Sequence, residues 1–323
     1  MATGTGIDEV TPSGGRDRDW DAPFPQRTTL RSLQNTWAKW RQRPLGIFGL
    51  VIVILATILA IGAAYIAPHD PQAFVGPPLE SPSGSYPLGT NSLGQDVLSR
   101  TIYGAQVSMA VAFVATFVGV ALGTVLGLVS GYFGGWVDMS SQRFMEVLAA
   151  LPGLMLVLIV VAALGRPKES GTDVVMLGWQ LRSLSLAISL GFIFGVMRVI
   201  RSAVLKERGL PYVEAATTIG ASTPRIIFRH ILPNVFPYVI VTFTTIFGAV
   251  ILIEAGVSFL GYGVSIGTPS WGLDLSGRSR EYFISAPWVM LGPGVALTLT
   301  VLGFNFLGDT LRDVLDPRLR GSR

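Results

Sequence analysis

Residues 212–234 read YVEAATTIGASTPRIIFRHILPN, a polar stretch that holds basic residues, one glycine and two prolines. Runs of sequence that are apolar enough to cross a membrane lie on both sides of it. Such a run needs about 20 apolar residues to span the hydrocarbon core of a bilayer. The stretch, which we call the elbow, is therefore a polar connection within a membrane protein.

The chain of 323 residues is 50% hydrophobic and 14% charged, whereas a soluble domain carries about 25% charged residues. Five windows hold no Asp, Glu, Lys or Arg apart from Asp70 and are long enough for transmembrane helices, namely residues 44–79, 101–137, 147–165, 231–253 and 282–308. A shorter window, residues 183–197, has the weakest signal of the six. The sequence predicts an all-α membrane protein with six transmembrane helices. Pro152 predicts a kink in the third of them.

The basic residues indicate how the chain is oriented. If the N-terminus is cytoplasmic, eighteen of the 24 Lys and Arg residues lie on the cytoplasmic side. Such an excess is what the positive-inside rule requires. Both termini and the elbow are therefore predicted to be cytoplasmic.

Composition divides the chain into four parts. Residues 1–35 are rich in Gly, Thr, Pro and mixed charge, which predicts a disordered cytoplasmic tail. Residues 36–100 are predicted to hold the first span and a proline-rich outer loop. Residues 101–316 are predicted to form the core with five spans, and residues 317–323 a short cytoplasmic tail.

A ladder of glycines marks the second predicted span, where Gly119, Gly123, Gly127 and Gly131 recur at every fourth residue. This spacing places them on one helical face, where the lack of side chains lets another helix approach closely. We interpret the ladder as a helix-packing surface.

The elbow is predicted to form two short helices. The first runs from Pro211 to Ile219, and Gly220 can adopt the left-handed conformation that closes it. Thr223 followed by Pro224 predicts the N-cap and first turn of the second helix, which should end where Pro233 prevents continuation. From the residues alone, the elbow fits equally a connector that lies on the membrane or on the protein's own helix ends, and a docking site for a cytoplasmic partner.

No enzyme signature is present. The dipeptide Gly-Lys does not occur, so the chain lacks a phosphate-binding loop and is not predicted to be an ATPase itself. There is no cysteine, and the two histidines, His69 and His230, lie on opposite sides of the membrane in the predicted topology. We expect no catalytic centre, metal site or cofactor in this chain.

Four blocks of sequence resemble a known family. Glu214-Ala215-Ala216, Gly220 and the tail HILPN are similar to the EAA loop of permease subunits in binding-protein-dependent ABC importers. The other blocks resemble the second permease of the dipeptide, oligopeptide and nickel class, and they are PLGTNSLGQDVLSRTIYGAQVS (87–108), EAGVSFLGYGVSIGTPSWG (254–272) and DTLRDVLDPRLRG (309–321). The resemblance implies the transmembrane domain of a type I ABC importer.

The resemblance also chooses between the two interpretations of the elbow. It implies a coupling helix that docks on a cytoplasmic ATPase subunit, where the ATP and Mg²⁺ are bound. The implied coupling residues are Glu214, Ala215, Ala216, Gly220 and Arg225. Glu214 and Arg225 are expected to pair with each other or to cap helices.

The implied partners are a second permease subunit, two ATPase subunits or one fused ATPase, an extracytoplasmic substrate-binding protein and the lipid bilayer, with no nucleic acid. The implied location is the bacterial cytoplasmic membrane. Di- or oligopeptides are the implied cargo, with nickel chelates or glutathione as alternatives. A different class, an ion-driven secondary transporter, would show inverted repeats and charges at mid-membrane depth, and we find neither.

Two features of the outer segments remain open. Glu254 is either an acid that lines the translocation path or a group that caps or hydrogen-bonds within the outer segment. Asn91, Gln95 and Gln106 stand where members of the family usually carry an aspartate and two arginines. The usual ion pairs of this loop are therefore not expected here.

Overall fold

The computed structural model describes residues 40, 43–164, 179–265 and 267–315. The predicted tails, residues 1–35 and 317–323, lie outside the described residues. The described part is built from helices and contains no strand, only an isolated bridge between Thr90 and Asp96.

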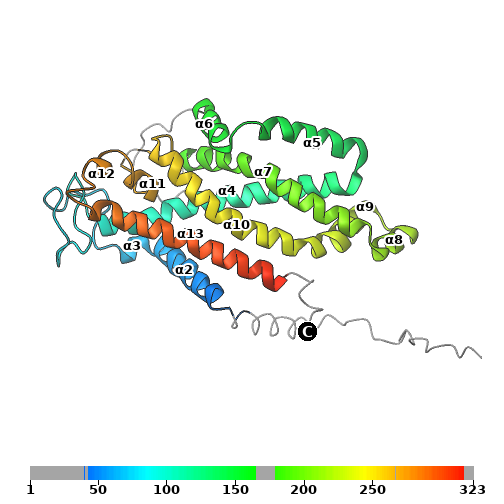
Figure 1. Cartoon of the computed structure of the whole chain (residues 1–323), viewed down its shortest axis with the longest axis horizontal. Helices are drawn as coiled ribbons and strands as arrows, with labels where there is room; N and C mark the ends of the chain where they lie inside the picture. The colour runs from blue at the N-terminus through cyan, green and yellow to red at the C-terminus, as the bar shows by residue number, and fades with distance from the viewer. Residues whose placement is uncertain (1–39, 41–42, 165–178, 266, 316–323) are drawn as a thin grey trace, which may run out of the picture.

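The helices form one elongated bundle (Figure 1). Their bounds are α2 Pro44–Ile61, α3 Ala63–Ile66, α4 Val97–Phe133, α5 Gly135–Ala149, α6 Gly153–Leu164, α7 Trp179–Arg208, α8 Pro211–Thr218, α9 Thr223–Arg225, the π-helix η1 Ile226–Ile231, α10 Leu232–Phe259, α11 Trp271–Asp274, α12 Arg278–Glu281 and α13 Trp288–Leu315.

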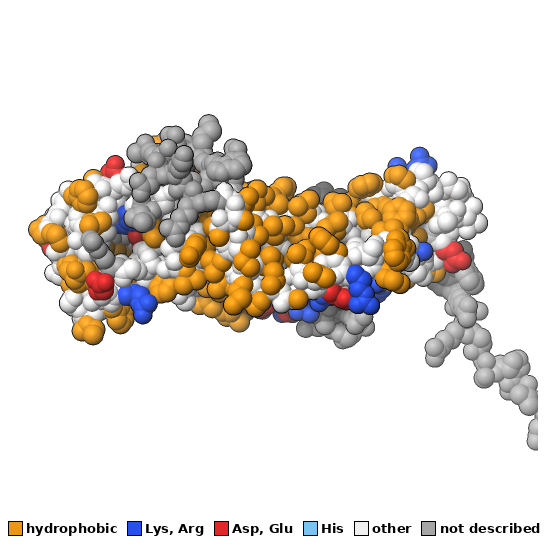
Figure 2. All heavy atoms as spheres, turned by 90° about the horizontal axis from the view of Figure 1, so that it is seen from above, with side chains coloured by type: hydrophobic (Ala, Val, Ile, Leu, Met, Phe, Trp, Pro, Cys, Tyr) orange, Lys and Arg blue, Asp and Glu red, His pale blue; other side chains and the backbone are white. Residues whose placement is uncertain are grey.

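Five helices are long and apolar enough to cross a membrane, and a bent pair raises the number to as many as six. The five are Pro44–Ile61, Val97–Phe133, Ser183–Arg208, Thr223–Phe259 and Trp288–Leu315. Figure 2 shows hydrophobic side chains in a broad band around the middle of the bundle, with charged side chains mainly toward its ends. These features confirm the prediction of an all-α membrane protein.

The third and fourth predicted spans differ from expectation. Window 147–165 is not one continuous helix, because α5 and α6 meet at an angle of 86°. Pro152 lies at this break, where its ring and missing N–H group prevent α5 from continuing, so the predicted kink is confirmed. The weakest window, 183–197, lies within the 30-residue helix α7. A helix of this length extends about 45 Å, which exceeds the hydrocarbon core of about 30 Å. The basic residues predicted to follow the fourth span in a loop, such as Arg198, therefore belong to its helix.

The predicted boundary at residue 100 falls inside α4, which begins at Val97. Asp96 caps this helix, because its side chain accepts hydrogen bonds from the backbone N–H groups of Leu98 and Ser99. The charge of Arg100 placed the start of the apolar window at residue 101, but the helix itself starts earlier and includes Arg100.

The glycine ladder lies in the contact between α4 and α7. A Cβ atom at Gly123 would lie 2.6 Å from Cβ of Val196, and one at Gly131 would lie 2.8 Å from Cβ of Val204. A Cβ at Gly127 would lie 2.8 Å from the Met197 carbonyl oxygen, whereas Gly119 is less crowded, with its nearest atom at 3.3 Å. Close approach of α7 thus requires glycine most strictly at the three later positions.

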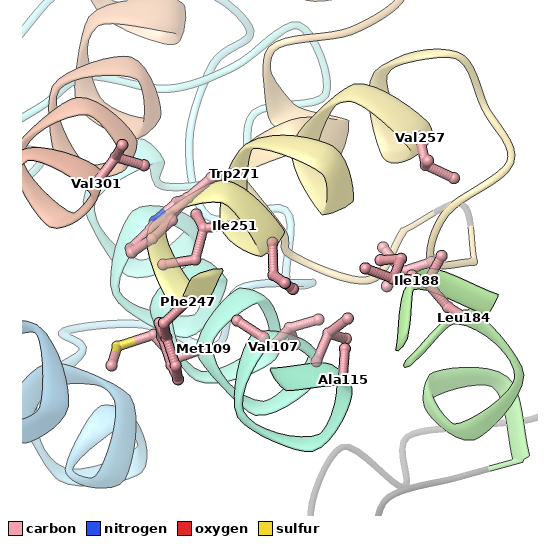
Figure 3. Close-up of a cluster of buried hydrophobic side chains, with 14 of the residues drawn as sticks. Val107, Met109, Ala115, Leu184, Ile188, Phe247, Ile251, Val257, Trp271 and Val301 are labelled. Carbon is pink, nitrogen blue, oxygen red and sulfur yellow. The ribbon is translucent and has the colours of Figure 1, made fainter. Parts of the chain in front are cut away.

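The largest core cluster joins α4, α7, α10 and α13 to Trp271 of α11 (Figure 3). Trp271 lies beside Ile251 in this view and is 1% exposed. Its indole N–H donates a hydrogen bond of 2.9 Å to the carbonyl oxygen of Thr101, and a Cβ at Gly104 would lie 2.8 Å from its ring. Two of the sequence blocks, 87–108 and 254–272, are therefore packed directly against each other.

A region that we call the cap, residues 67–100, 260–265 and 267–288, lies at the end of the bundle near α11 and α12. Arg100 is its centre. Its guanidinium donates to Asp274 at 2.9 and 2.5 Å, to the side-chain oxygen of Gln95 at 3.1 Å and to the carbonyl oxygen of Pro71 at 3.1 Å. Gln95 in turn accepts a hydrogen bond of 2.8 Å from the side-chain amide of Asn91. An amide pair thus occupies two of the positions where the resemblance leads one to expect charges.

Candidate coupling site

The first half of the elbow folds as predicted. The helix α8 begins at Pro211, and Gly220 follows it with a φ of 77°. The N–H group of Gly220 donates to the carbonyl of Thr217, and that of Ala221 to the carbonyl of Ala216, both at 3.0 Å. These two bonds form a Schellman motif, which requires the left-handed conformation that glycine adopts most readily.

The second half of the elbow differs from the prediction in two ways. The N-cap is Ser222 rather than Thr223, and it makes no side-chain capping bond. The helix does not end at Pro233, since α9, η1 and α10 continue into one another. The wide π-helical turn Ile226–Ile231 precedes the proline, and the side-chain amide of Asn234 donates 2.9 Å to the His230 carbonyl. Such a turn gives the pyrrolidine ring room at the start of the next helical segment.

One face of the elbow is anchored to the end of the bundle. Five of its apolar side chains are buried in a second hydrophobic cluster with residues of α4 and α7, and they are Val213, Ala216, Ile226, Ile227 and Ile231. The Tyr212 hydroxyl donates a hydrogen bond of 2.7 Å to Glu207 and accepts one of 3.0 Å from Asn234. Burial and the Glu207 carboxylate raise the pKa of Tyr212 to about 12, so the hydroxyl stays protonated and keeps donating. The elbow is therefore joined rigidly to α7 and α10.

Another part of the elbow's surface is exposed and carries two large apolar side chains. Ile219 is 84% exposed and Phe228 is 65% exposed. A Cβ at Gly220 would meet no atom within 4 Å, so this corner faces open space. Exposed apolar side chains in a polar setting are typical of surfaces that bind a partner.

The five predicted coupling residues do not all lie on this face. Glu214, Ala215, Gly220 and Arg225 are exposed, but Ala216 is buried in the chain's own cluster. No ion pair or side-chain hydrogen bond within the described part of the chain joins Glu214 to Arg225. Their expected pairing is therefore not seen, because the two residues lie on separate helices whose placement local sequence does not determine. The prediction also gave Phe228 no role, although a large apolar residue between Arg225 and Arg229 could have indicated one.

The elbow projects beyond the other helices. Figure 1 shows α8 at the extreme end of the bundle, past the end of α13. Its exposed face is mixed, with Thr217, Thr218 and Ser222 near Ile219. A helix that lies on a membrane presents a continuous apolar face instead. This geometry speaks against a connector that lies on the membrane, whereas one face of the elbow does pack on the protein's own helix ends. Docking of a partner on the other face stays a prediction.

Glu254 lies away from the elbow, in the core at the cap end of α10. Its side chain has no exposed surface, and it accepts a hydrogen bond of 2.8 Å from the Ser258 hydroxyl. The side chain faces no open path in this structure, and its assignment to the translocation path stays a prediction. The alternative, hydrogen bonding within the outer segment, fits the contact with Ser258.

No group of three His, Cys, Asp or Glu side chains that could hold a metal ion occurs among the described residues.

Comparison with known proteins agrees with this architecture. Residues 123–321 match the model of the binding-protein-dependent transport system inner membrane component. The chain belongs to this family. Residues 32–82 match the N-terminal transmembrane domain of oligopeptide transport permease C.

Three relatives can be aligned with nearly the whole chain. The dipeptide transport system permease protein DppC of Alkalihalophilus pseudofirmus is 36% identical over 300 residues, which is 92% of this chain and 94% of the relative. The glutathione transport system permease protein GsiD of Escherichia coli is 38% identical over 287 residues, or 88% of this chain and 90% of the relative. The GsiD protein of Shigella sonnei has the same identity and coverage.

Proposed function

We propose that the chain is a membrane-spanning permease subunit of an ATP-driven importer of the peptide class, coupled to separate ATPase subunits through the elbow. The observation that carries this proposal is the elbow's geometry, with one face buried against α7 and α10 and the other exposing Ile219 and Phe228. ATP and Mg²⁺ would bind to the ATPase partners, and this chain would supply no catalytic group.

Rigid attachment suits a coupling element. When an ATPase subunit moves, a docked elbow moves with it, and the α7 and α10 ends must follow because five buried side chains and Tyr212 join them to the elbow. Glu214 and Arg225 have no partner within the described residues and are available to charged groups on the ATPase surface. A second permease subunit and an extracytoplasmic binding protein complete the proposed importer.

The proposed location is the bacterial cytoplasmic membrane, with the elbow and both termini in the cytoplasm. The excess of basic residues on the elbow side supports this orientation. The cap then faces the outside, where a binding protein would deliver its substrate.

Peptides are the proposed cargo. The relatives are named for dipeptide and glutathione transport, and glutathione is itself a small peptide. Uptake of a labelled dipeptide by cells that hold the complete importer, with unlabelled glutathione as competitor, would separate the two. Failure of both peptides to enter, together with uptake of a nickel chelate, would contradict the peptide assignment.

Docking of the elbow can be tested by co-purification. We expect Ile219→Asp and Phe228→Asp to remove the ATPase subunits from the purified complex and to abolish transport, because each places a charge at the apolar docking contact. Ile284→Asp is the matched control, since Ile284 is 96% exposed in the cap at the other end of the bundle. Full retention of the ATPase by both elbow variants, at normal membrane levels, would refute the docking role.

A further inference from the structure

The helices α2 and α13 provide a measure of depth in the membrane. They pack antiparallel, since a Cβ at Gly46 would lie 2.5 Å from Thr310 and one at Gly49 would lie 2.7 Å from the Gly303 carbonyl. Arg43, directly before the apolar run of α2, forms an ion pair with Asp313 near the end of α13. This pair marks where the apolar layer begins on the elbow side of the bundle.

Two polar residues of α13 lie deeper than this mark. Asp309 is one helical turn from Asp313 and Asn305 is two turns away, which corresponds to about 6 and 12 Å along the axis. Both side chains are exposed in the subunit. Neither makes a hydrogen bond or ion pair to another described residue.

The neighbouring helix α2 exposes a different surface at the same depth. Leu45 is 59% exposed and Phe48 is 51% exposed, and the Phe48 ring lies 6.3 Å from that of Phe306. Apolar side chains of this kind suit lipid tails. An unpaired amide and carboxylate do not, because polar groups at membrane depth face protein or water.

The polar surface continues from α13 onto α10, which runs beside it (Figure 1). A Cβ at Gly308 would lie 3.2 Å from the Thr245 hydroxyl, and one at Gly248 would lie 3.1 Å from the side-chain oxygen of Asn305. Thr245 is exposed as well. Thr245, Asn305 and Asp309 thus form one exposed polar strip where α10 and α13 are in contact.

We propose that this polar strip lines the water-filled translocation path, whereas the exposed face of α2 contacts lipid. The inference rests on the proposed function, because the path requires a second permease subunit opposite the strip. The three side chains suit a zwitterionic peptide in transit. Asp309 offers a carboxylate to its ammonium group, and Asn305 and Thr245 offer hydrogen bonds to its peptide groups.

The chain contains no cysteine, so single cysteines can be introduced without background. In the purified importer reconstituted in lipid vesicles, we would label Asn305→Cys and Asp309→Cys with a charged, water-soluble maleimide. Phe48→Cys and Leu45→Cys are the controls at matching depths. A thiol whose pKa is raised by about one unit in apolar surroundings has about tenfold less reactive thiolate, so the strip should react at least about tenfold faster than the controls.

Binding of non-hydrolysable ATP should change the labelling rate of the strip but not of the controls, because only the path changes its access to water during transport. Equal rates at the strip and on α2, in a complex that still hydrolyses ATP in response to substrate, would overturn this inference alone. A chain that assembles with no ATPase subunit would instead contradict the proposed function.

Discussion

The elbow and the cap are the two polar ends of one bundle, but they use their polar side chains in opposite ways. In the cap, Arg100, Asp96 and Thr90 are buried, and each hydrogen-bonds to other parts of the cap. In the elbow, Glu214 and Arg225 are exposed, and neither has an ion-pair partner among the described residues. These three polar groups of the cap are bonded within the subunit, whereas Glu214 and Arg225 of the elbow are left for a partner.

The difference suggests how one subunit can serve both sides of a membrane. A self-contained cap keeps the ends of α4, α10 and α13 in register without help. An elbow with a buried anchor and an open face passes motion from a partner to α7 and α10. Substitutions in the cap should therefore affect folding first, and those in the elbow should affect coupling first.

The largest effect on stability is expected in the cap. Arg100→Met would leave the Asp274 carboxylate, whose side chain is 13% exposed, without its guanidinium partner. Removing one member of a buried ion pair costs about 3–5 kcal/mol. We expect a large drop in the thermal midpoint of the detergent-solubilised protein and in its level in the membrane.

The matched control for this prediction is Arg143→Met. Arg143 pairs with Glu146 at 2.9 Å, but its side chain is 78% exposed, and an exposed pair is worth about 0–1 kcal/mol. The double variant Arg100→Met with Asp274→Leu should recover much of the lost stability, since it removes the uncompensated charge. Equal stability of Arg100→Met and Arg143→Met would show that Arg100 does not hold the cap together.

A smaller loss of stability is expected where α4 packs against α7, between the two ends of the bundle. Gly123→Leu would drive a side chain into Val196 and the Ile193 carbonyl, and overpacking of this kind costs about 1–3 kcal/mol. Gly119→Ala should cost less, because the nearest atom there is 3.3 Å away, against 2.6 Å at Gly123. Thermal unfolding of both variants would test whether the contact of α4 with α7 depends on the glycine ladder. Similar midpoints would contradict this dependence.

The elbow should respond in function more than in stability. Gly220→Val forces a β-branched residue to adopt a φ of 77°, which costs about 1–2 kcal/mol. We expect the protein to insert normally but to lose substrate-stimulated ATP hydrolysis, because the corner of the docking face changes shape. Gly220→Asn should retain more activity, as asparagine tolerates this conformation better. Normal coupling in Gly220→Val would mean that this corner is not part of the docking site.

Much of this arrangement follows from local sequence, but not all of it. Gly220 was predictable because a helix end needs only neighbouring residues to form a Schellman motif. The weak window 183–197 underestimated α7, because charges were taken to end a span. Arg201 instead remains within α7 and forms a bidentate ion pair with Asp138 of α5, at 2.5 Å for each contact.

Properties that depend on packing between distant elements were not predictable. The burial of Glu254 depends on how α10 packs against its neighbours, which no local pattern specifies. The lack of pairing between Glu214 and Arg225 depends on the angle between two short helices. Window 147–165 was uniformly apolar, so composition could not reveal that α5 and α6 bend by 86°.

Tyr212→Phe tests how firmly the elbow is joined to the bundle. The variant loses the hydrogen bond to Glu207 and an acceptor for Asn234, at a cost of about 0.5–1.5 kcal/mol per bond. The folded state raises the pKa of Tyr212 from 10.0 to about 12, so it holds the hydroxyl proton more tightly than the unfolded chain does. The hydroxyl's contribution is therefore complete below pH 10 and is lost as the pH rises toward 12.

Thermal midpoints of wild type and Tyr212→Phe, measured across this alkaline range, should consequently converge as the pH rises. Tyr65→Phe is the control, since Tyr65 is 94% exposed and its hydroxyl has no hydrogen bond to another described residue. That variant should match wild type throughout. The absence of a gap between wild type and Tyr212→Phe near neutral pH would instead indicate that the Tyr212 ring, which both proteins keep, joins the elbow to α7 without help from the hydroxyl.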